Sequence, residues 1–333
     1  MKTLKFLTNL VFIFSMMSVT LIGCNNDDQE IPNPDVKVPD GEALQNKYVE
    51  FLESETQTFS INIDNGGSVT SAQGTYLYFS PNSMQDAQGN EVTGDIDIEF
   101  IELYDKAQML LGDKSTRGRQ EDGSIATLVS GGEFFVNAQK DGEQLQLMPG
   151  IGFQIMVETD NLDMGMQLFV NENEDCVEVD CDVIWEQANG RLEAGDAQGG
   201  NGEGGGVYYG FADNFGWTNI DRWYSDPRPK TTLFVDVPEG YDNTNCGVFL
   251  SYDGEPTALA KLDVYDEETE LFTEHYGQIP IGLEVHFIVL SVIDDQYYYA
   301  IQGATITENH VEIIGDLSPI TEAELIQLVE ALP

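Results

Sequence analysis

Residues 132–147 of the chain read GEFFVNAQKDGEQLQL, with the dipeptide Asp141-Gly142 near the middle. Asp-Gly supplies the positive backbone φ angles that a two-residue hairpin turn requires. The apolar and polar residues on either side of it therefore predict two antiparallel strands. A similar alternation occurs at 58–64, TFSINID, and at 94–103, GDIDIEFIEL. Together these stretches predict an all-β fold whose sheets bury one face.

The glycine-rich run at 195–206, GDAQGGNGEGGG, interrupts the strand patterns. Seven of its twelve residues are glycine, so we expect a domain boundary or a long loop there. Strand patterns occupy 46–160 before it and 207–333 after it, and 161–206 forms an irregular segment. The last stretch, SPITEAELIQLVEAL at 318–332, predicts a short amphipathic helix that opens with a capping box. The prediction is two β-sandwich-like domains with one short C-terminal helix.

The first domain resembles a known family over about residues 57–158. The stretch at 74–100, GTYLYFSPNSMQDAQGNEVTGDIDIEF, and the later VSGGEFFVNAQKDGEQL at 129–145 are similar to the ZU5-like β-sandwich of many Bacteroidota surface proteins. More remotely they resemble cartilage intermediate layer proteins. The matching residues of the first stretch are Pro81, Met84, Asp86, Gly89, Val92 and Gly94. The resemblance implies an interaction or structural module, and it carries no catalytic residues to transfer.

The first 23 residues have the pattern of a secretory signal peptide. Lys2 and Lys5 precede a diluted apolar stretch that makes a poor membrane span. Residues 21–24, LIGC, resemble the bacterial lipobox, in which the cysteine is acylated after cleavage. We therefore expect Cys24 to be lipidated and to anchor the protein in membrane lipid, because several acyl chains bind far more firmly than one.

Residues 24–45 are expected to form a tether behind the lipidated cysteine. The acidic stretch NNDDQE at 25–30 looks like the export signal that follows the lipidated cysteine in many Bacteroidota surface lipoproteins. This resemblance implies that the protein lies in the outer membrane and is exposed on the cell surface. The alternative is a solvated tether on a lipoprotein that faces the periplasm.

The charge of the chain is strongly acidic, with 59 acidic and 14 basic residues. Removal of residues 1–23 takes away two lysines and no acid, so twelve basic residues remain and the net charge becomes −47. Binding to nucleic acid depends on Lys and Arg that neutralise phosphates. We therefore expect no nucleic-acid partner.

Three cysteines remain beside Cys24. Cys176 and Cys181 enclose four residues, VEVD, and in an oxidising compartment this spacing favours a local disulfide. A metal site is the alternative, but it would need further histidine or cysteine ligands, and none lies nearby in the sequence. Cys246 is expected to be a buried small hydrophobic residue.

The sequence contains no recognisable catalytic motif. In particular, it lacks H-E-x-x-H, G-x-S-x-G and a phosphate-binding loop. The clusters DAQGNE and NENED lack the register of an EF-hand, although a structural calcium ion on such acidic turns is an open alternative. We therefore expect no enzyme activity and no cofactor. A secreted hydrolase is the least favoured alternative, since it would require a site assembled by the fold.

Residues 208–227, YYGFADNFGWTNIDRWYSDP, gather seven aromatic residues around Arg222. The Gly-Trp-x-Asn-x-Asp-Arg pattern within it is similar to one that opens the final domain of many Bacteroidota proteins of unknown function, although Ile220 replaces the usual cysteine. Trp217 and Trp223 could stack on a glycan, or they could begin the core of the second domain, with Arg222 paired to an acid.

The sequence as a whole favours a surface lipoprotein that acts as a non-catalytic binding or structural module with an unknown protein or glycan partner. A glycan-binding accessory lipoprotein is the second interpretation. Aromatic rings exposed together on one face would distinguish it.

Overall fold

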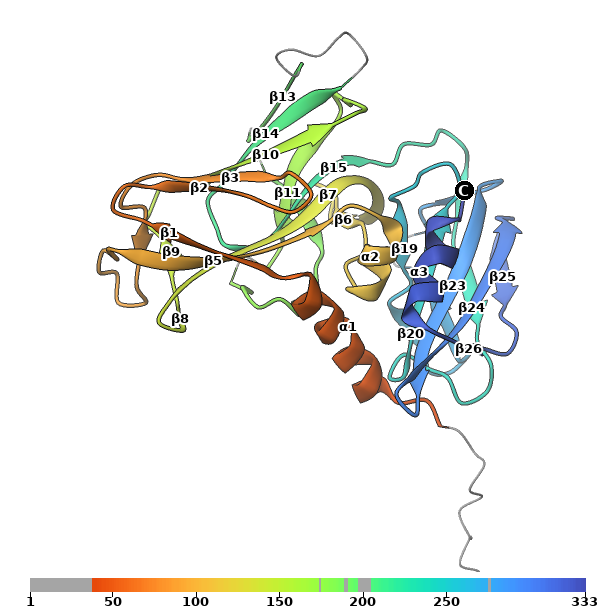
Figure 1. Ribbon diagram of the computed structural model, residues 1–333. Helices are drawn as coiled ribbons and strands as arrows, with labels where there is room; N and C mark the ends of the chain where they lie inside the picture. Colours follow the sequence, from red (N-terminus) through yellow and green to blue (C-terminus); the bar gives the residue numbers. More distant parts are fainter. Residues whose placement is uncertain (1–37, 174, 189–190, 197–204, 275–276) are drawn as a thin grey trace, which may run out of the picture. The chain divides into compact units, whose positions relative to one another are not determined.

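The structure is a computed structural model that describes residues 38–333 apart from 174, 189–190, 197–204 and 275–276. The signal peptide, Cys24 and the tether up to residue 37 lie outside the described residues. Of the described chain, most regular structure is strand, which confirms the all-β class (Figure 1). None of its helices is long and apolar enough to cross a bilayer.

Sheet A is the largest sheet, and its strands come from widely separated parts of the chain (Figure 1). In spatial order it contains β1 (Gln57–Asn62), β5 (Asp95–Leu103), β7 (Ile125–Lys140), β15 (Gly216–Trp223), β11 (Gln167–Asn171), β12 (Trp185–Gln187) and β6 (Arg117–Arg119), and β8 (Glu143–Gln144) also pairs with β7. The β7–β8 hairpin turns at Asp141 and Gly142, which have φ angles of 53° and 80°. The hairpin prediction is therefore confirmed.

Sheet B faces sheet A across an apolar core that includes Leu77, Phe100, Phe134 and Ile155. Its order is β13 (Leu192–Asp196), β14 (Gly206–Ala212), β10 (Phe153–Thr159), β3 (Tyr76–Phe79) and β2 (Gly67–Thr70). A short antiparallel pair, β4 (Met84–Gln85) with β9 (Gln146–Leu147), contributes Met84 to the same core.

The C-terminal part of the described chain forms two further large sheets and a separate two-stranded pair, with a core that includes Val248, Phe272 and Phe287. Sheet C has the order β19 (Leu259–Lys261), β18 (Cys246–Tyr252), β23 (Glu284–Ile293), β24 (Gln296–Thr305) and β26 (Ser318–Ile320). Sheet D has the order β20 (Val264–Asp266), β21 (Leu271–Thr273), β17 (Leu233–Asp236) and β25 (His310–Ile313), and β16 (Lys230–Thr231) pairs with β22 (Ile279–Pro280).

A third core joins sheet A to sheet C through three helices, α1 (Gly41–Glu55), α2 (Lys106–Leu111) and α3 (Glu322–Glu330). α2 packs against α3, and α1 contacts β23 and β5. The capping box of α3, formed by Thr321 and Glu324, confirms the predicted C-terminal helix. α1 begins earlier than the tether was expected to end, because the Asp40 carboxylate accepts a hydrogen bond from the Ala43 N–H at 3.0 Å and caps the helix.

The strands after the glycine-rich run differ from the sequence prediction. β14 and β15 were assigned to the C-terminal domain of residues 207–333, but β14 pairs with β10 in sheet B and β15 pairs with β7 and β11 in sheet A. The run itself connects β13 to β14, which are antiparallel partners. It therefore links two strands of one sheet, and residues 37–333 form one compact unit.

Candidate functional site

Trp217 is a core residue and is only 3% exposed. It lies on β15, in the interior of sheet A, with its ring 5.4 Å from that of Phe135. Its indole N–H donates a hydrogen bond to the Val179 carbonyl at 3.0 Å, and the Lys114 ammonium lies 5.1 Å from its ring centre. The stacking role considered for Trp217 is therefore wrong, because sheet A and the third core cover the ring.

Trp223 and Arg222 also have protein partners. Trp223 is half-buried and packs edge-to-face on Phe169 at 5.5 Å. Arg222 forms ion pairs with Asp163 at 2.9 Å and Glu255 at 3.0 Å, so it ties the sandwich to the loop after β18. These contacts favour the structural interpretation of the aromatic segment, in which Arg222 is paired to acids.

The exposed aromatic residues lie instead on the outer face of sheet B. In β3, Leu77 and Phe79 point into the core, so Tyr76 and Tyr78 project to the opposite face and are half-exposed. In β14, Tyr208 is buried while Tyr209 and Phe211 are 44% and 41% exposed. With the half-exposed Met156 of β10, Tyr76, Tyr78, Tyr209 and Phe211 form what we call the aromatic face.

The strand register places these side chains in two adjacent rows. Met156 pairs with Tyr76 on one side and with Tyr209 on the other, which gives the first row. The second row is Tyr78, Gln154 and Phe211. Since neighbouring strands are about 4.8 Å apart, the rings of one row are separated by about 10 Å, with a flexible side chain between them. The face is therefore apolar but discontinuous, with polar groups inside it.

A cleft of about 430 Å³ lies at the β14 side of the aromatic face. Its lining combines Tyr209, Phe211 and Met156 with the polar side chains of Gln154, Arg191 and Glu193. Arg191 forms an ion pair with Asp213, which fixes the guanidinium beside Phe211. Aromatic faces next to charged and amide groups can bind a ligand that has both apolar surface and hydroxyl groups.

A second polar cluster is completely closed to solvent. Glu133 on β7 lies opposite Asn219 on β15, and both are fully buried beside Asp221. Asn219 donates a hydrogen bond to Asp221 Oδ2 at 2.6 Å and accepts one from Ser130 at 3.0 Å. Both oxygens of Glu133 and Oδ1 of Asp221 lack a hydrogen-bond partner in the described chain.

Burial shifts the pKa of both carboxyl groups. It raises the pKa of Asp221 to about 8, although the hydrogen bond from Asn219 and the polar groups of the neighbouring Ser130 and Gly131 oppose the rise. Burial and the nearby Asp221 raise the pKa of Glu133 well above its usual value, while Lys114 acts against that shift. Burial therefore favours the protonated form of both groups, and their position gives no access to a substrate.

Among the described residues, a histidine and a carboxylate that could suit hydrolysis lie together on sheet C. His286 Nδ1 is 2.8 Å from the Asp253 carboxylate, and Ser251 is the register partner of His286. Ser251 Oγ, however, accepts a hydrogen bond at 2.6 Å from Lys106, and both residues are buried. A serine that is covered and bonded to Lys106 cannot meet a substrate from solvent.

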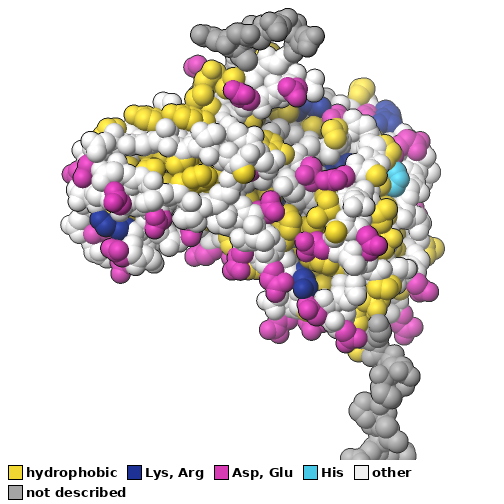
Figure 2. All heavy atoms as spheres, viewed as in Figure 1, with side chains coloured by type: hydrophobic (Ala, Val, Ile, Leu, Met, Phe, Trp, Pro, Cys, Tyr) yellow, Lys and Arg dark blue, Asp and Glu magenta, His cyan; other side chains and the backbone are white. Residues whose placement is uncertain are grey.

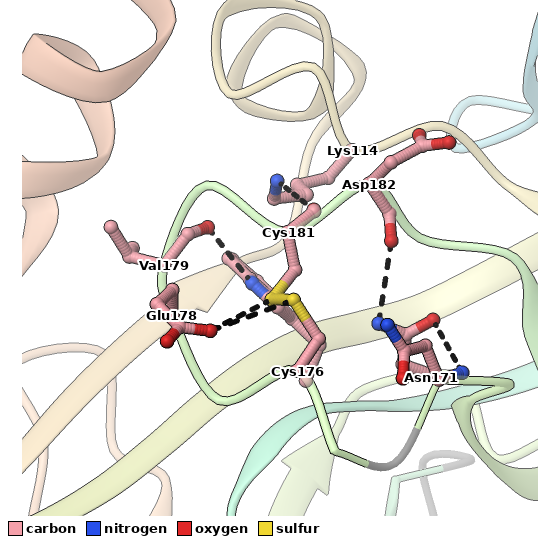
Figure 3. The surroundings of a disulfide bond; sticks show 9 residues. Lys114, Asn171, Cys176, Glu178, Val179, Cys181 and Asp182 are labelled. Carbon is pink, nitrogen blue, oxygen red and sulfur yellow. Dashed lines mark hydrogen bonds between the residues drawn. A yellow bond between two sulfur atoms is a disulfide. The ribbon is translucent and has the colours of Figure 1, made fainter.

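The disulfide predicted from the cysteine spacing is present between Cys176 and Cys181 (Figure 3). It lies in a loop whose backbone bonds to the third core, because Lys114 donates to the Cys181 carbonyl at 2.7 Å and Trp217 to that of Val179. The expected burial of Cys246 is confirmed, and desolvation raises the pKa of its thiol to about 12.

Of the two acidic clusters considered for calcium, NENED at 171–175 includes residue 174, which lies outside the described residues. The other, DAQGNE at 86–91, forms a turn that is closed by its own hydrogen bonds. Asp86 accepts hydrogen bonds from the N–H groups of Gln88 and Asn90 at 2.9 and 2.8 Å, and from the Asn90 side chain. These bonds lower the pKa of Asp86 and account for the residue as part of a β-turn.

No protein-family model matches the chain, and no curated protein matches it. The segment 208–227 did contain part of the exposed site, but its exposed members are Tyr209 and Phe211 rather than the tryptophans. Tyr76 and Tyr78 could have been found from the strict alternation of YLYF, because one face of that strand carries only tyrosine.

Proposed function

We propose that the protein is a lipid-anchored protein of the outer membrane that is exposed on the cell surface and acts as a non-catalytic binding module. The lipobox-like LIGC and the acidic stretch behind it support the anchor and the location. The ZU5-like resemblance of residues 57–158 supports a binding or structural role. Figure 2 shows acidic side chains spread over the visible surface with few basic ones, which suits a partner that is not an anion.

The aromatic face of sheet B carries the proposal that the ligand is a glycan. Tyr209 and Phe211 expose a large part of their rings, and Tyr76 lies in the same row as Tyr209. A sugar ring presents an apolar C–H face to an aromatic ring and hydroxyl groups at its edge. Gln154 and Glu193 offer hydrogen-bonding groups beside the rings, so the surface is complementary to both parts of a sugar.

Strand geometry makes this face a rigid support. The four aromatic side chains come from β3 and β14, whose opposite faces are packed in the core through residues such as Leu77 and Tyr208. The rings are therefore held in position before a ligand arrives, which lowers the entropy cost of binding.

The test is retention of the mature protein on immobilised cellulose, xylan, starch, mannan and chitin by affinity electrophoresis. Tyr209→Ala with Phe211→Ala should weaken retention on the bound polysaccharide at least about tenfold, because an aromatic anchor contributes about 1–2 kcal/mol or more and 1.4 kcal/mol corresponds to tenfold. Ile313→Ala is the control, since Ile313 is exposed on sheet D. Equal retention of the double variant, with its melting temperature unchanged, would remove the aromatic face as the site.

Membrane attachment has a separate test. Cys24→Ser should move the protein from the detergent phase to the aqueous phase in phase partitioning, because the acyl chains supply almost all of its membrane affinity. If the variant remains in the detergent phase, the anchor is elsewhere.

A further inference from the structure

The disulfide loop at residues 175–184 is held in place by bonds that do not involve sulfur. The carbonyl groups of Val179 and Cys181 accept hydrogen bonds from Trp217 and Lys114. At the base of the loop, the Glu172 N–H donates to the Ile184 carbonyl at 2.8 Å. Loss of the sulfur–sulfur bond would therefore leave the two cysteines close together.

A carboxylate faces both sulfur atoms of this loop (Figure 3). Glu178 Oε2 lies 3.7 Å from Cys176 Sγ and 3.9 Å from Cys181 Sγ. A disulfide sulfur carries no hydrogen, so the carboxylate receives no hydrogen bond from either atom in the oxidised state. Within the described part of the chain, these residues form the one group of three or more His, Cys, Asp and Glu residues whose ligand atoms all lie within 4.8 Å of one another.

These distances are close to those of a tetrahedral zinc site. With Zn–S of about 2.3 Å and Zn–O of about 2.1 Å, a tetrahedral angle places sulfur and oxygen about 3.6 Å apart and the two sulfurs about 3.8 Å apart. The sulfur–oxygen distances already have nearly this value. The sulfurs need only separate, which side-chain rotation can provide because the Cα atoms are 6.1 Å apart.

We propose that reduction of the Cys176–Cys181 disulfide converts this loop into a Zn²⁺ site. Cys176 Sγ, Cys181 Sγ and the Glu178 carboxylate would be the three protein ligands, and water would take the fourth position. Two thiolates select a borderline-soft ion such as Zn²⁺ over calcium or magnesium. The site does not depend on glycan binding at the aromatic face.

The chemistry proceeds in two balanced steps. A dithiol reductant gives two electrons and two protons to the disulfide, so the sulfur–sulfur bond breaks, two thiols form, and the reductant becomes a disulfide. Zn²⁺ then replaces the two thiol protons, which are released to solvent. Lys114, bonded to the Cys181 carbonyl, places a positive charge near the thiolates, and the exposed Asp175 and Asp180 attract the incoming cation.

The test uses the mature protein reduced under anaerobic conditions with a phosphine, which is oxidised to its oxide. Zinc is titrated in competition with a chromophoric chelator, and cobalt is added separately to observe thiolate-to-metal charge transfer and the visible bands of a tetrahedral site. We expect one ion per chain in the reduced protein and at least about tenfold weaker binding after reoxidation.

Matched variants assign the ligands. Glu178→Gln should weaken zinc binding at least about tenfold, since even the loss of an outer-shell partner costs 10- to 100-fold. Cys176→Ser should reduce the cobalt charge-transfer band by at least about half, since one of the two thiolates is lost, whereas Cys246→Ser should change neither readout because Cys246 is buried elsewhere in sheet C. Absence of stoichiometric binding to the reduced protein, or equal binding by Glu178→Gln, would overturn the proposal.

Discussion

At the scale of single residues, the buried carboxyl group of Asp221 makes stability depend on pH. Its pKa is about 8 in the folded protein, against about 3.9 in an unfolded chain. Between these values the unfolded chain releases the proton while the folded protein keeps it. The contribution of Asp221 to the free energy of unfolding should therefore be greatest below about pH 4, decrease as the pH rises to about 8, and level off above that.

Asp221→Asn should reduce this pH dependence, because an amide has nearly the shape of the protonated acid and does not ionise. We expect the variant to resemble the native protein at pH 5 and to be more stable than it at pH 8, measured by urea denaturation. Part of the slope should remain, since burial also raises the pKa of Glu133. Glu143→Gln, on an exposed position of β8, is the control. An unchanged slope in Asp221→Asn would mean that the buried carboxyl is not the cause.

Individual residues also show what sequence patterns can and cannot predict. The Cys176–Cys181 bond follows from local spacing, and spacing is visible in the sequence. The environments of Glu133 and Asp221 are not visible, because each becomes buried only when β15 inserts next to β7, more than 80 positions away in the chain. Non-local pairing of this kind also decides that Trp217 is covered and Tyr209 is exposed.

At the scale of elements, the glycine-rich run connects the two paired strands of a hairpin, β13 and β14. Gly195 pairs with Val207 across β13 and β14, and β14 is the direct partner of β10. High glycine content indicated an interruption correctly, but composition does not tell a loop inside a sheet from a linker between domains. The distinction depends on which strands the flanking residues pair with, and that is set by tertiary contacts.

Cleavage of this connection should leave the protein in one piece. A site-specific protease sequence inserted after Gly200 would be cut to give fragments that separate on a denaturing gel. On size exclusion in native buffer they should elute together, because β14 and β15 are hydrogen-bonded to β10, β7 and β11. The insertion left uncut is the control. Two peaks after cleavage would restore the linker interpretation.

At the scale of the whole molecule, the third core makes the two predicted domains interdependent. It contains Phe135 and Trp217 from sheet A together with Phe249 and Leu290 from sheet C. Polar contacts join the two parts as well: Arg222 donates a hydrogen bond to Glu255, and Lys106 donates one to Ser251. The sequence indicated two sandwich-like domains because each has strand patterns, but the apolar residues that join them cannot be told apart by pattern from those inside each sandwich.

Leu290→Ala tests whether the two parts unfold together. Leu290 is fully buried on β23, so its truncation should lower the free energy of unfolding by about 2–5 kcal/mol. All three tryptophans, at 185, 217 and 223, lie on strands of sheet A and belong to or pack against the third core, so their fluorescence reports the unfolding of sheet A. The buried thiol of Cys246 reports sheet C through its reactivity as the chain unfolds.

If residues 37–333 form one cooperative unit, both probes should shift to the same lower urea concentration in Leu290→Ala. Leu77→Ala, which truncates the core between sheets A and B, is the reciprocal variant and should shift the Cys246 probe as far as the fluorescence. Independent domains would behave differently: Leu290→Ala would move only the thiol midpoint, and Leu77→Ala only the fluorescence midpoint. Because a shared core removes apolar surface from water only while both parts are folded, we expect the two midpoints to stay together in both variants.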